Sequence, residues 1–108
     1  MPFILFMLIV LTTVSNGEQA ESLAHKIVEA RLAACVQILP PISSVYFWEN
    51  AIQKDSEILL LVKTLPEKYD ALEEFIKSNH PYDVPEIVAI SAEKVSKNYL
   101  DWMRSYVK

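Results

Sequence analysis

The 108-residue sequence contains only one glycine and one cysteine. Because Gly17 is the only glycine, there is no glycine-rich phosphate loop, which argues against nucleotide binding of the P-loop or Rossmann kind. A ligand cleft built from side chains is not excluded. With Cys35 as the only cysteine, the chain has no intrachain disulfide, no zinc-finger spacing and no redox Cys-x-x-Cys motif. These absences suit a reducing compartment, and we expect no required cofactor.

Basic residues are also scarce, with 10 Lys and Arg against 14 Asp and Glu and a net charge of −4. Nucleic-acid binders need basic residues to neutralise phosphates, and no run rich in them exists here, so we expect no nucleic-acid partner. No apolar run reaches the ~20 residues that a helix needs to span a bilayer, so we expect no membrane association. The length fits one domain over residues 1–108.

The most hydrophobic segment, residues 3–11, has two interpretations. One is a secretory signal peptide, but no basic residue precedes the run and residues 14–16 make a poor cleavage site. The other is a strand buried on both faces, which has no solvent side on which polar residues alternate. Composition alone does not decide between them, or whether this segment is ever cleaved.

A helix is predicted directly after this run. Ser15 and Glu18 have the spacing of a capping box, in which each side chain accepts a hydrogen bond from the other residue's backbone N–H. The helix is expected to end near Leu32 or Ala33. Its apolar stripe recurs at spacings of three and four: Ala20, Leu23, Ala24, Ile27 and Val28.

A long hairpin follows this helix. Residues 35–39 and 44–48 have the β-branched and aromatic content of strands, with an interruption at the proline pair 40–41. The polar pair 49–50 marks the turn. Residues 52–63 then return as a third strand whose second half is strongly apolar.

The remaining chain predicts a helix, a strand and a last helix. Thr64 and Glu67 form a second predicted capping box, for a helix that stops at Asn79, a residue that tolerates the left-handed backbone of a helix end. A strand is predicted at residues 86–90. Ser96 can cap the terminal helix.

The predicted order is strand, helix, strand, strand, helix, strand and a final helix. This is an α+β fold, a ferredoxin-like βαββαβ sandwich with an antiparallel sheet and an added C-terminal helix. In that topology the first and third strands lie in the middle of the sheet, and they are the two most continuous apolar runs here. The topology therefore favours a retained central strand at residues 3–13 over a signal peptide.

Four segments carry a family resemblance: residues 32–36 (LAACV), 46–49 (YFWE), 80–86 (HPYDVPE) and 99–102 (YLDW). In this order they resemble the signature segments of the CutA divalent-cation tolerance family, and the match spans essentially the whole chain. The resemblance implies a non-enzymatic, cytoplasmic homotrimer, similar in architecture to PII signalling proteins and connected with tolerance of copper and other divalent metals. The alternative is a PII-like regulatory module that binds a small ligand at the clefts between subunits.

The resemblance also implies that the copper ligands of one family member, a cysteine and two histidines, correspond to Thr12, Asn79 and His80. Only His80 is a good copper ligand, since threonine is a poor ligand for a soft or borderline metal and Asn79 offers only a weak carbonyl donor. Cys35 would suit Cu(I), and Glu57 falls near the crevice between subunits in this family. We therefore predict weak binding of copper or another divalent cation, with His80, Cys35 and Glu57 as candidate ligands.

Residues 78–86 also have a structural interpretation, which we favour. A helix stop is followed by a corner stiffened by two prolines, in which Tyr82 packs and Asp83 bonds to the backbone. His80 is then one retained donor in a rigid corner. No catalytic residue is predicted, because a cysteine nucleophile needs a histidine partner and none is evident.

The third predicted strand indicates that the protein is an oligomer. Its apolar residues alternate between the two faces of the sheet, with Ile58, Leu60 and Val62 on one face and Leu59 and Leu61 on the other. Helices cover one face of the sheet. At roughly 25 cal/mol per Å² of apolar surface, leaving the side chains of the other face in water would cost several kcal/mol. The family resemblance makes the oligomer a homotrimer, with residues 46–48 as the candidate contact with a neighbouring subunit.

Overall fold

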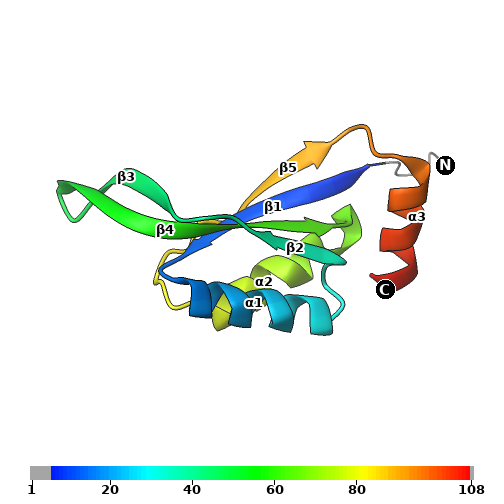
Figure 1. The fold of residues 1–108 in the computed structure, drawn as a ribbon, viewed down its shortest axis with the longest axis horizontal. Coiled ribbons are helices and arrows are strands. Elements are labelled where there is room, and N and C mark those ends of the chain that lie inside the picture. The colour runs from blue at the N-terminus through cyan, green and yellow to red at the C-terminus, as the bar shows by residue number, and fades with distance from the viewer. Residues whose placement is uncertain (1–5, 108) are drawn as a thin grey trace.

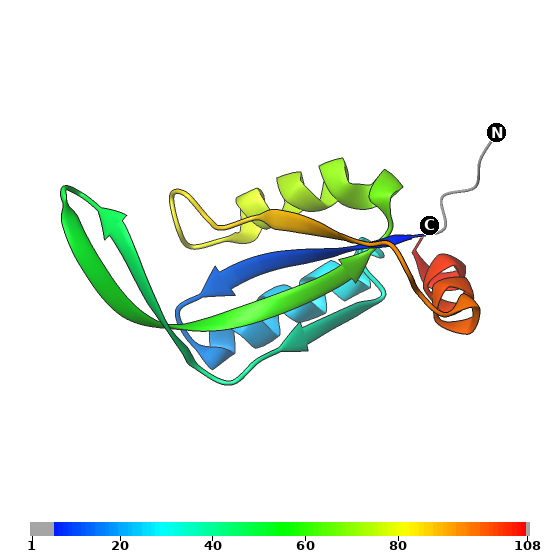
Figure 2. The same ribbon diagram turned by 90° about the horizontal axis from the view of Figure 1, so that it is seen from above.

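The computed structural model describes residues 6–107 of the chain. Its helices and strands are, in order, β1 (Met7–Val14), α1 (Gly17–Glu29), β2 (Cys35–Ile38), β3 (Ile42–Trp48), β4 (Ala51–Thr64), α2 (Tyr69–Asn79), β5 (Val88–Ala92) and α3 (Lys97–Tyr106). Helices α1 and α2 cover one face of an antiparallel sheet, and α3 lies at one end of it (Figure 1 and Figure 2). The predicted α+β, ferredoxin-like fold with an added C-terminal helix is confirmed.

The sheet has the strand order β2-β4-β1-β5, and β3 pairs with the part of β4 that extends beyond β2. Strands β1 and β4 are the central pair, as predicted, with Val10 opposite Val62. On its other edge β1 pairs with β5, where Ile9 lies opposite Ile90. In the described part of the chain, no helix is both long and apolar enough to cross a bilayer.

The strand interpretation of the apolar N-terminal run is confirmed where the structure describes it. Strand β1 begins at Met7 and continues one residue past the predicted end, to Val14. It pairs with neighbours on both edges, and Val10 and Val14 are fully buried. Residues 3–5 of the predicted strand lie outside the described residues.

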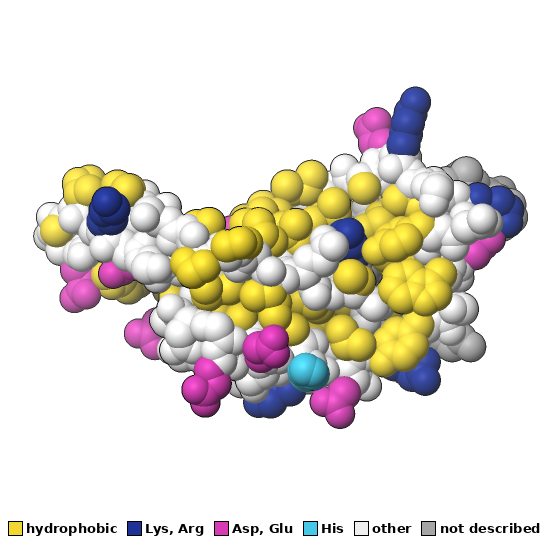
Figure 3. Space-filling view, in the orientation of Figure 1, with side chains coloured by type: hydrophobic (Ala, Val, Ile, Leu, Met, Phe, Trp, Pro, Cys, Tyr) yellow, Lys and Arg dark blue, Asp and Glu magenta, His cyan; other side chains and the backbone are white. Residues whose placement is uncertain are grey.

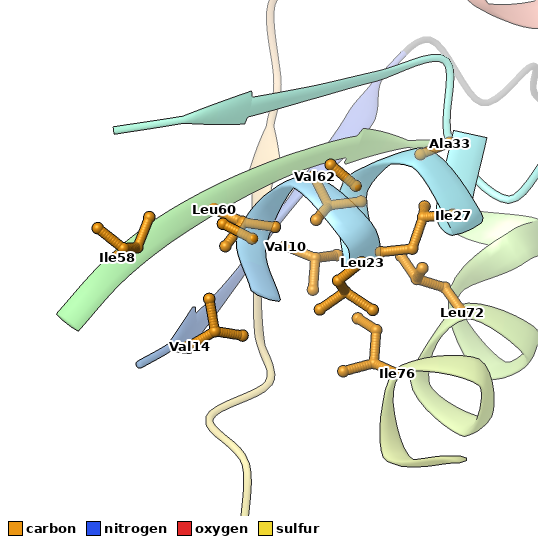
Figure 4. Close-up of a cluster of buried hydrophobic side chains, with 12 residues drawn as sticks. Val10, Val14, Leu23, Ile27, Ala33, Ile58, Leu60, Val62, Leu72 and Ile76 are labelled. Carbon is orange, nitrogen blue, oxygen red and sulfur yellow. The ribbon is translucent and has the colours of Figure 1, made fainter. Parts of the chain in front are cut away.

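The main hydrophobic core lies between the sheet and the helix pair α1 and α2 (Figure 4). Ile58, Leu60 and Val62, which were predicted to share one face of the sheet, all face this core. Each Leu, Ile or Val that is fully buried contributes about 1.5–3 kcal/mol relative to an exposed one. The helices supply the opposing side chains: Leu23 and Ile27 from α1, and Leu72 and Ile76 from α2.

Helix α1 is capped by Asn16 rather than by Ser15, so the predicted capping box was misplaced. The Asn16 side chain accepts a hydrogen bond from the Gln19 backbone N–H at 2.9 Å. Gln19 Oε1 accepts in turn from the Ser15 backbone N–H at 3.0 Å, and Glu18 has no part in this exchange. Asparagine and serine cap helices about equally well, and the Ser15 hydroxyl is bonded elsewhere, to Tyr82.

The second predicted capping box was wrong. Thr64 is the last residue of β4, is fully buried, and donates its hydroxyl proton to the Leu32 carbonyl at 2.6 Å. A short 3₁₀ turn, Pro66–Lys68, precedes α2 instead and has no side-chain cap. A buried hydroxyl needs a partner, and Leu32 supplies one that the sequence pattern does not reveal.

Helix α1 ends at Glu29, before the predicted end at residues 32–33. The chain reverses at Arg31, whose φ of 59° lies in the left-handed region. Arg31 also holds the C-terminal helix, because its Nη1 donates to the Tyr106 carbonyl at 3.0 Å and its guanidinium lies 4.4 Å from the Tyr106 ring centroid. The early stop leaves residues 32–34 free to lead into β2.

Two other boundaries agree with the prediction only in part. Helix α2 ends at Asn79, as predicted, but Asn79 is not among the residues with a left-handed backbone. The predicted turn is confirmed, since Glu49 and Asn50 have φ of 50° and 61°, the values of a two-residue type I′ hairpin turn. Strand β5 begins at Val88, two residues later than predicted.

The β3–β4 hairpin projects past the helices as an arm, residues 42–57, in a molecule that measures 48 × 24 × 24 Å (Figure 1). Because side chains alternate along a strand, the arm has two sides. Tyr46 and Trp48 lie on the same side as Glu57, which we call the inner side. The outer side is strongly exposed and apolar: Val45 (66%), Phe47 (66%) and Ile52 (73%).

The sheet face opposite the helices is also apolar, and we call it the open face. Leu11 lies between Leu61 and Val88 on this face, and Val88 and Ile90 are half exposed. Helix α3 packs only against one end of it, near Met7. Figure 3 shows hydrophobic side chains gathered along the sheet and again at the end of the arm.

Candidate functional site

The chain between α2 and β5 forms a corner that His80 ties to β1. His80 Nε2 lies 2.7 Å from the Thr13 carbonyl oxygen, and the Tyr82 backbone N–H donates to His80 Nδ1 at 3.1 Å. Because Nδ1 accepts a hydrogen bond, the proton of the neutral ring sits on Nε2, which donates to Thr13. Both ring nitrogens therefore form hydrogen bonds with backbone groups, and these bonds hold the corner against β1.

Tyr82 links this corner to β4. Its hydroxyl donates to Glu57 Oε2 at 2.8 Å, and its ring centroid lies 4.7 Å from that of His80. Since the Tyr82 hydroxyl uses its hydrogen in the bond to Glu57, the Ser15 hydroxyl, 3.1 Å away, donates to the Tyr82 oxygen. One hydrogen-bond chain thus joins the end of β1, the corner and β4.

A second phenol–carboxylate pair lies on the arm, where the Tyr46 hydroxyl donates to Asp55 Oδ2 in a short hydrogen bond. This bond raises the pKa of Tyr46 to about 12. Burial raises the pKa of Tyr82, the bond from Ser15 opposes the rise, and the bond to Glu57 adds to it. Both phenols keep their protons at neutral pH and act as donors to the carboxylates.

An open cavity of about 600 Å³ lies between the inner side of the arm and the corner, and we call it the arm-base cavity. Its lining combines three aromatic side chains with three carboxylates: Tyr46, Trp48, Tyr82, Glu57, Asp83 and Glu86. Among the residues that the structure describes, no lysine or arginine lines it. The cavity is therefore negatively charged and partly aromatic.

The three predicted metal ligands do not lie together. Glu57 lines the arm-base cavity, His80 lies in the adjoining corner with both nitrogens bonded, and Cys35 lies opposite Lys63 at the other end of β4. Within residues 6–107, no group of three or more His, Cys, Asp or Glu side chains is arranged to hold a metal ion. Within one chain, these residues fit single metal contacts and not a chelating site.

The other two positions that the resemblance matches to copper ligands, Thr12 and Asn79, are not directed at a shared site with His80. Thr12 is fully buried, and its Oγ1 has no hydrogen-bond partner among the described residues. The Asn79 side-chain amide donates to the Phe75 carbonyl at 2.8 Å, within its own helix. Neither residue adds a ligand to His80 in this arrangement.

Sequence reasoning missed several residues of the cavity. Tyr46 was predicted only as part of a contact with a neighbouring subunit, although the two-residue turn of the hairpin sets a register that brings it beside Asp55. The pair of Glu57 and Tyr82 had no local signal, because 25 residues separate them. Asp83 was expected to bond to the backbone, but it has no hydrogen bond among the described residues and lines the cavity instead.

Comparison with known sequences agrees with this fold and these segments. The family described as "CutA1 divalent ion tolerance protein" matches residues 8–106. The divalent-cation tolerance protein CutA of Thermus thermophilus is 47% identical over 96 residues, which are 89% of this chain and 93% of that protein. The chloroplastic protein CutA 1 of Oryza sativa is 45% identical over 98 residues, which are 91% of this chain and 55% of that protein.

A human relative, Protein CutA, is 42% identical over 92 residues, which are 85% of this chain and 51% of that protein. The chain therefore spans about half the length of the rice and human relatives, and nearly all of the Thermus protein.

Solved structures show the same fold. The Thermus thermophilus divalent cation tolerance protein superposes with a TM-score of 0.91 at 44% identity, covering 94% of this chain and 99% of that one. CutA1 from Oryza sativa superposes with a TM-score of 0.92 at 42% identity, covering 96% of this chain and 95% of that one. With a family match over nearly its whole length, this chain belongs to the CutA1 divalent ion tolerance protein family.

Proposed function

We propose that this protein is a non-enzymatic homotrimer that takes part in tolerance of copper and other divalent metals, by weak cation binding at His80 and at the carboxylates of the adjoining arm-base cavity. The observation that carries the proposal is the cavity itself, which places Glu57, Asp83 and Glu86 around one space with no basic residue among the described lining. The family's printed description supports the link to divalent ions. That description names tolerance of divalent ions and does not name a chemical reaction.

Two apolar surfaces support the trimer. The open face exposes about half of Val88 and of Ile90, and the outer side of the arm exposes more than half of Phe47 and of Ile52. The arm projects away from the rest of the described chain (Figure 2), and the side chains of its outer side stay exposed among the described residues. An arm that lies on a neighbouring subunit would bury both kinds of surface.

Weak metal affinity follows from the separation of the candidate ligands. Glu57 is the most accessible to a cation because it lines the cavity. A metal at His80 must displace one of two backbone groups from the ring, and Cys35 is a separate soft donor.

Two measurements test this proposal. Light scattering should give a mass of about three times the 12.3 kDa of the chain, unchanged on dilution to low micromolar concentration. Calorimetric titration with copper should show weak binding that His80→Ala abolishes and that Glu57→Gln reduces, while Glu67→Gln, outside the cavity, serves as the control. A stable monomer, or tight copper binding that survives His80→Ala, would contradict the proposal, and Cys35→Ser would then be the next variant.

A second function is a PII-like regulatory module that binds a small ligand at clefts between subunits. The size of the cavity favours it, because about 600 Å³ is far more than one metal ion needs and lies within the range of about 300–1,000 Å³ for small-molecule sites. We also propose a cytoplasmic location, which the lone unpaired Cys35 supports. Fractionation of the native host tests the location.

A further inference from the structure

We propose that the arm-base cavity binds an organic ammonium ion. This inference rests on the second proposed function, the small-ligand module, and names the chemical class of its ligand. It follows from the charge of the cavity, the aromatic residues that line it and its volume.

The charge of the cavity selects a cation. Glu57, Asp83 and Glu86 line it, and the described lining contains no lysine or arginine to neutralise them. The Tyr46 hydroxyl donates a hydrogen bond to Asp55 and the Tyr82 hydroxyl donates one to Glu57, and both phenols keep their protons and stay neutral. An anionic ligand would have to approach these carboxylates without a positive partner.

The walls of the cavity select an organic cation over a metal ion. Tyr46 and Trp48 are two residues apart on one strand, so their side chains project from the same side of the arm toward the cavity. About 40% of Tyr46 and 44% of Trp48 are exposed, which leaves their rings accessible. Aromatic faces attract ammonium groups, most strongly on tryptophan. Aromatic faces do not take the place of the oxygen, nitrogen or sulfur ligands that divalent metals require.

The arrangement of the carboxylates also favours an organic cation over a metal ion. No cluster of three His, Cys, Asp or Glu suited to a metal exists in residues 6–107. Glu57 already accepts a hydrogen bond from Tyr82 through one oxygen. Carboxylates and aromatic rings that together line one large cavity suit a cation whose charge is spread over an alkylammonium group.

The test uses tetramethylammonium chloride as the probe and tert-butanol as a neutral molecule of similar shape. Both are titrated into the full-length protein at constant ionic strength, and binding is followed by the NMR shifts of the Trp48 indole and the Tyr82 amide. We expect saturable binding of tetramethylammonium and no saturation with tert-butanol. Trp48→Ala and Glu57→Gln should each weaken binding by about tenfold.

Glu67→Gln is the matched control, because it removes the same charge from the 3₁₀ turn, outside the cavity lining. It should bind tetramethylammonium like the unaltered protein. Equal loss in Glu67→Gln and Glu57→Gln would overturn the inference, because the effect would then be one of net charge. Equal binding of the two probes, or copper that displaces tetramethylammonium at stoichiometric concentration, would also overturn it.

The oligomeric mass separates this inference from the proposed function. A trimer that does not bind tetramethylammonium would overturn the ammonium site and leave the trimeric tolerance protein standing. Saturable binding of tetramethylammonium to a monomer would support the ammonium site and contradict the trimer.

Discussion

Two fully buried threonines, Thr12 and Thr64, show how differently one residue type can behave in this fold. Thr64 Oγ1 donates to the Leu32 carbonyl at 2.6 Å, which ties the end of β4 to the segment after α1. Thr12 Oγ1 is buried without a partner among the described residues. A buried hydroxyl without a hydrogen bond lowers stability, because it has lost its bonds to water and gained none.

We therefore predict that Thr12→Val and Thr64→Val change stability in opposite directions. Valine has nearly the shape of threonine, so each variant tests the hydroxyl. Thr12→Val should raise the free energy of unfolding by about 1 kcal/mol, and Thr64→Val should lower it by about 1 kcal/mol or more. Urea denaturation measures both values. A loss of stability in Thr12→Val would mean that its hydroxyl has a partner in solution.

His80 predicts a pH dependence of stability. Burial lowers its pKa below the usual 6.5, and the bond to the Thr13 carbonyl and the charge of Glu57 oppose this. The unfolded chain therefore takes up a proton at higher pH than the folded protein does, so stability falls as pH drops below about 6.5. Protonation also removes the acceptor at Nδ1 that the Tyr82 N–H needs.

The measurement is the free energy of unfolding between about pH 7.5 and pH 5.5, above the range where ordinary carboxyl groups titrate. His80→Gln should flatten this dependence. His25→Gln, which replaces the exposed histidine of α1, should retain it. An unchanged slope in His80→Gln would show that another group titrates.

At the scale of elements, α1 shows how a helix start is chosen between two good caps. Ser15 and Asn16 are neighbours, and both residue types cap helices well. Asn16 makes the cap bond, while the Ser15 hydroxyl bonds Tyr82. Two adjacent residues thus have different roles: Asn16 caps the start of α1, and Ser15 bonds the corner after α2.

Asn16→Ala should destabilise the protein by about 1 kcal/mol through loss of the cap. Ser15→Ala keeps the cap and loses only an exposed hydroxyl contact, so its effect should be smaller. Thermal or urea unfolding of the two variants gives the comparison. A larger effect for Ser15→Ala would mean that the helix is capped one residue earlier in solution.

At the scale of the whole molecule, the arm and the open face are the features that one chain leaves incomplete. The arm extends past the helices (Figure 1), and its outer side is the most exposed apolar cluster of the described chain. Its inner side lines the cavity with Tyr46 and Trp48. In the two proposals above, one hairpin would serve assembly on one side and ligand binding on the other.

Phe47→Lys should weaken the proposed trimer without unfolding the protomer, because Phe47 is 66% exposed in its own chain. Light scattering on dilution should show dissociation at higher protein concentration than in the unaltered protein, with an unchanged circular dichroism spectrum. Glu21→Gln, on the exposed side of α1, is the control for a change of one charge. A trimer that resists dilution as before would place the outer side of the arm outside the interface.

Much of the fold could be predicted because it depends on local pattern. The period of two in β4 separated its apolar residues into two faces, and the spacing of three and four in α1 identified Leu23 and Ile27 as part of the buried stripe. The Glu49-Asn50 turn was predicted from a polar pair between two strands, and both residues have a positive φ. The predicted helix start was wrong where a distant residue bonds the expected capping side chain. Thr64 is the example, because its hydroxyl donates to Leu32, 32 residues away.

The candidate site was predicted less well for the same reason. His80 and Glu57 were both identified, but their roles depend on Tyr82, which touches both. The arm-base cavity exists only because the corner and the arm meet across the sheet. Its charge is a sum over residues that lie far apart in the sequence.

The sequence by itself determined which segments are strands and helices, their order, and the apolar character of both sheet faces, because these depend on side-chain periods and on residue types at turns. Only the tertiary structure decided which cap α1 uses, which hydroxyl stays without a partner, and which carboxylates share a cavity. Those choices depend on hydrogen bonds and burial between residues such as Ser15 and Tyr82, 67 positions apart, whose meeting no local pattern encodes.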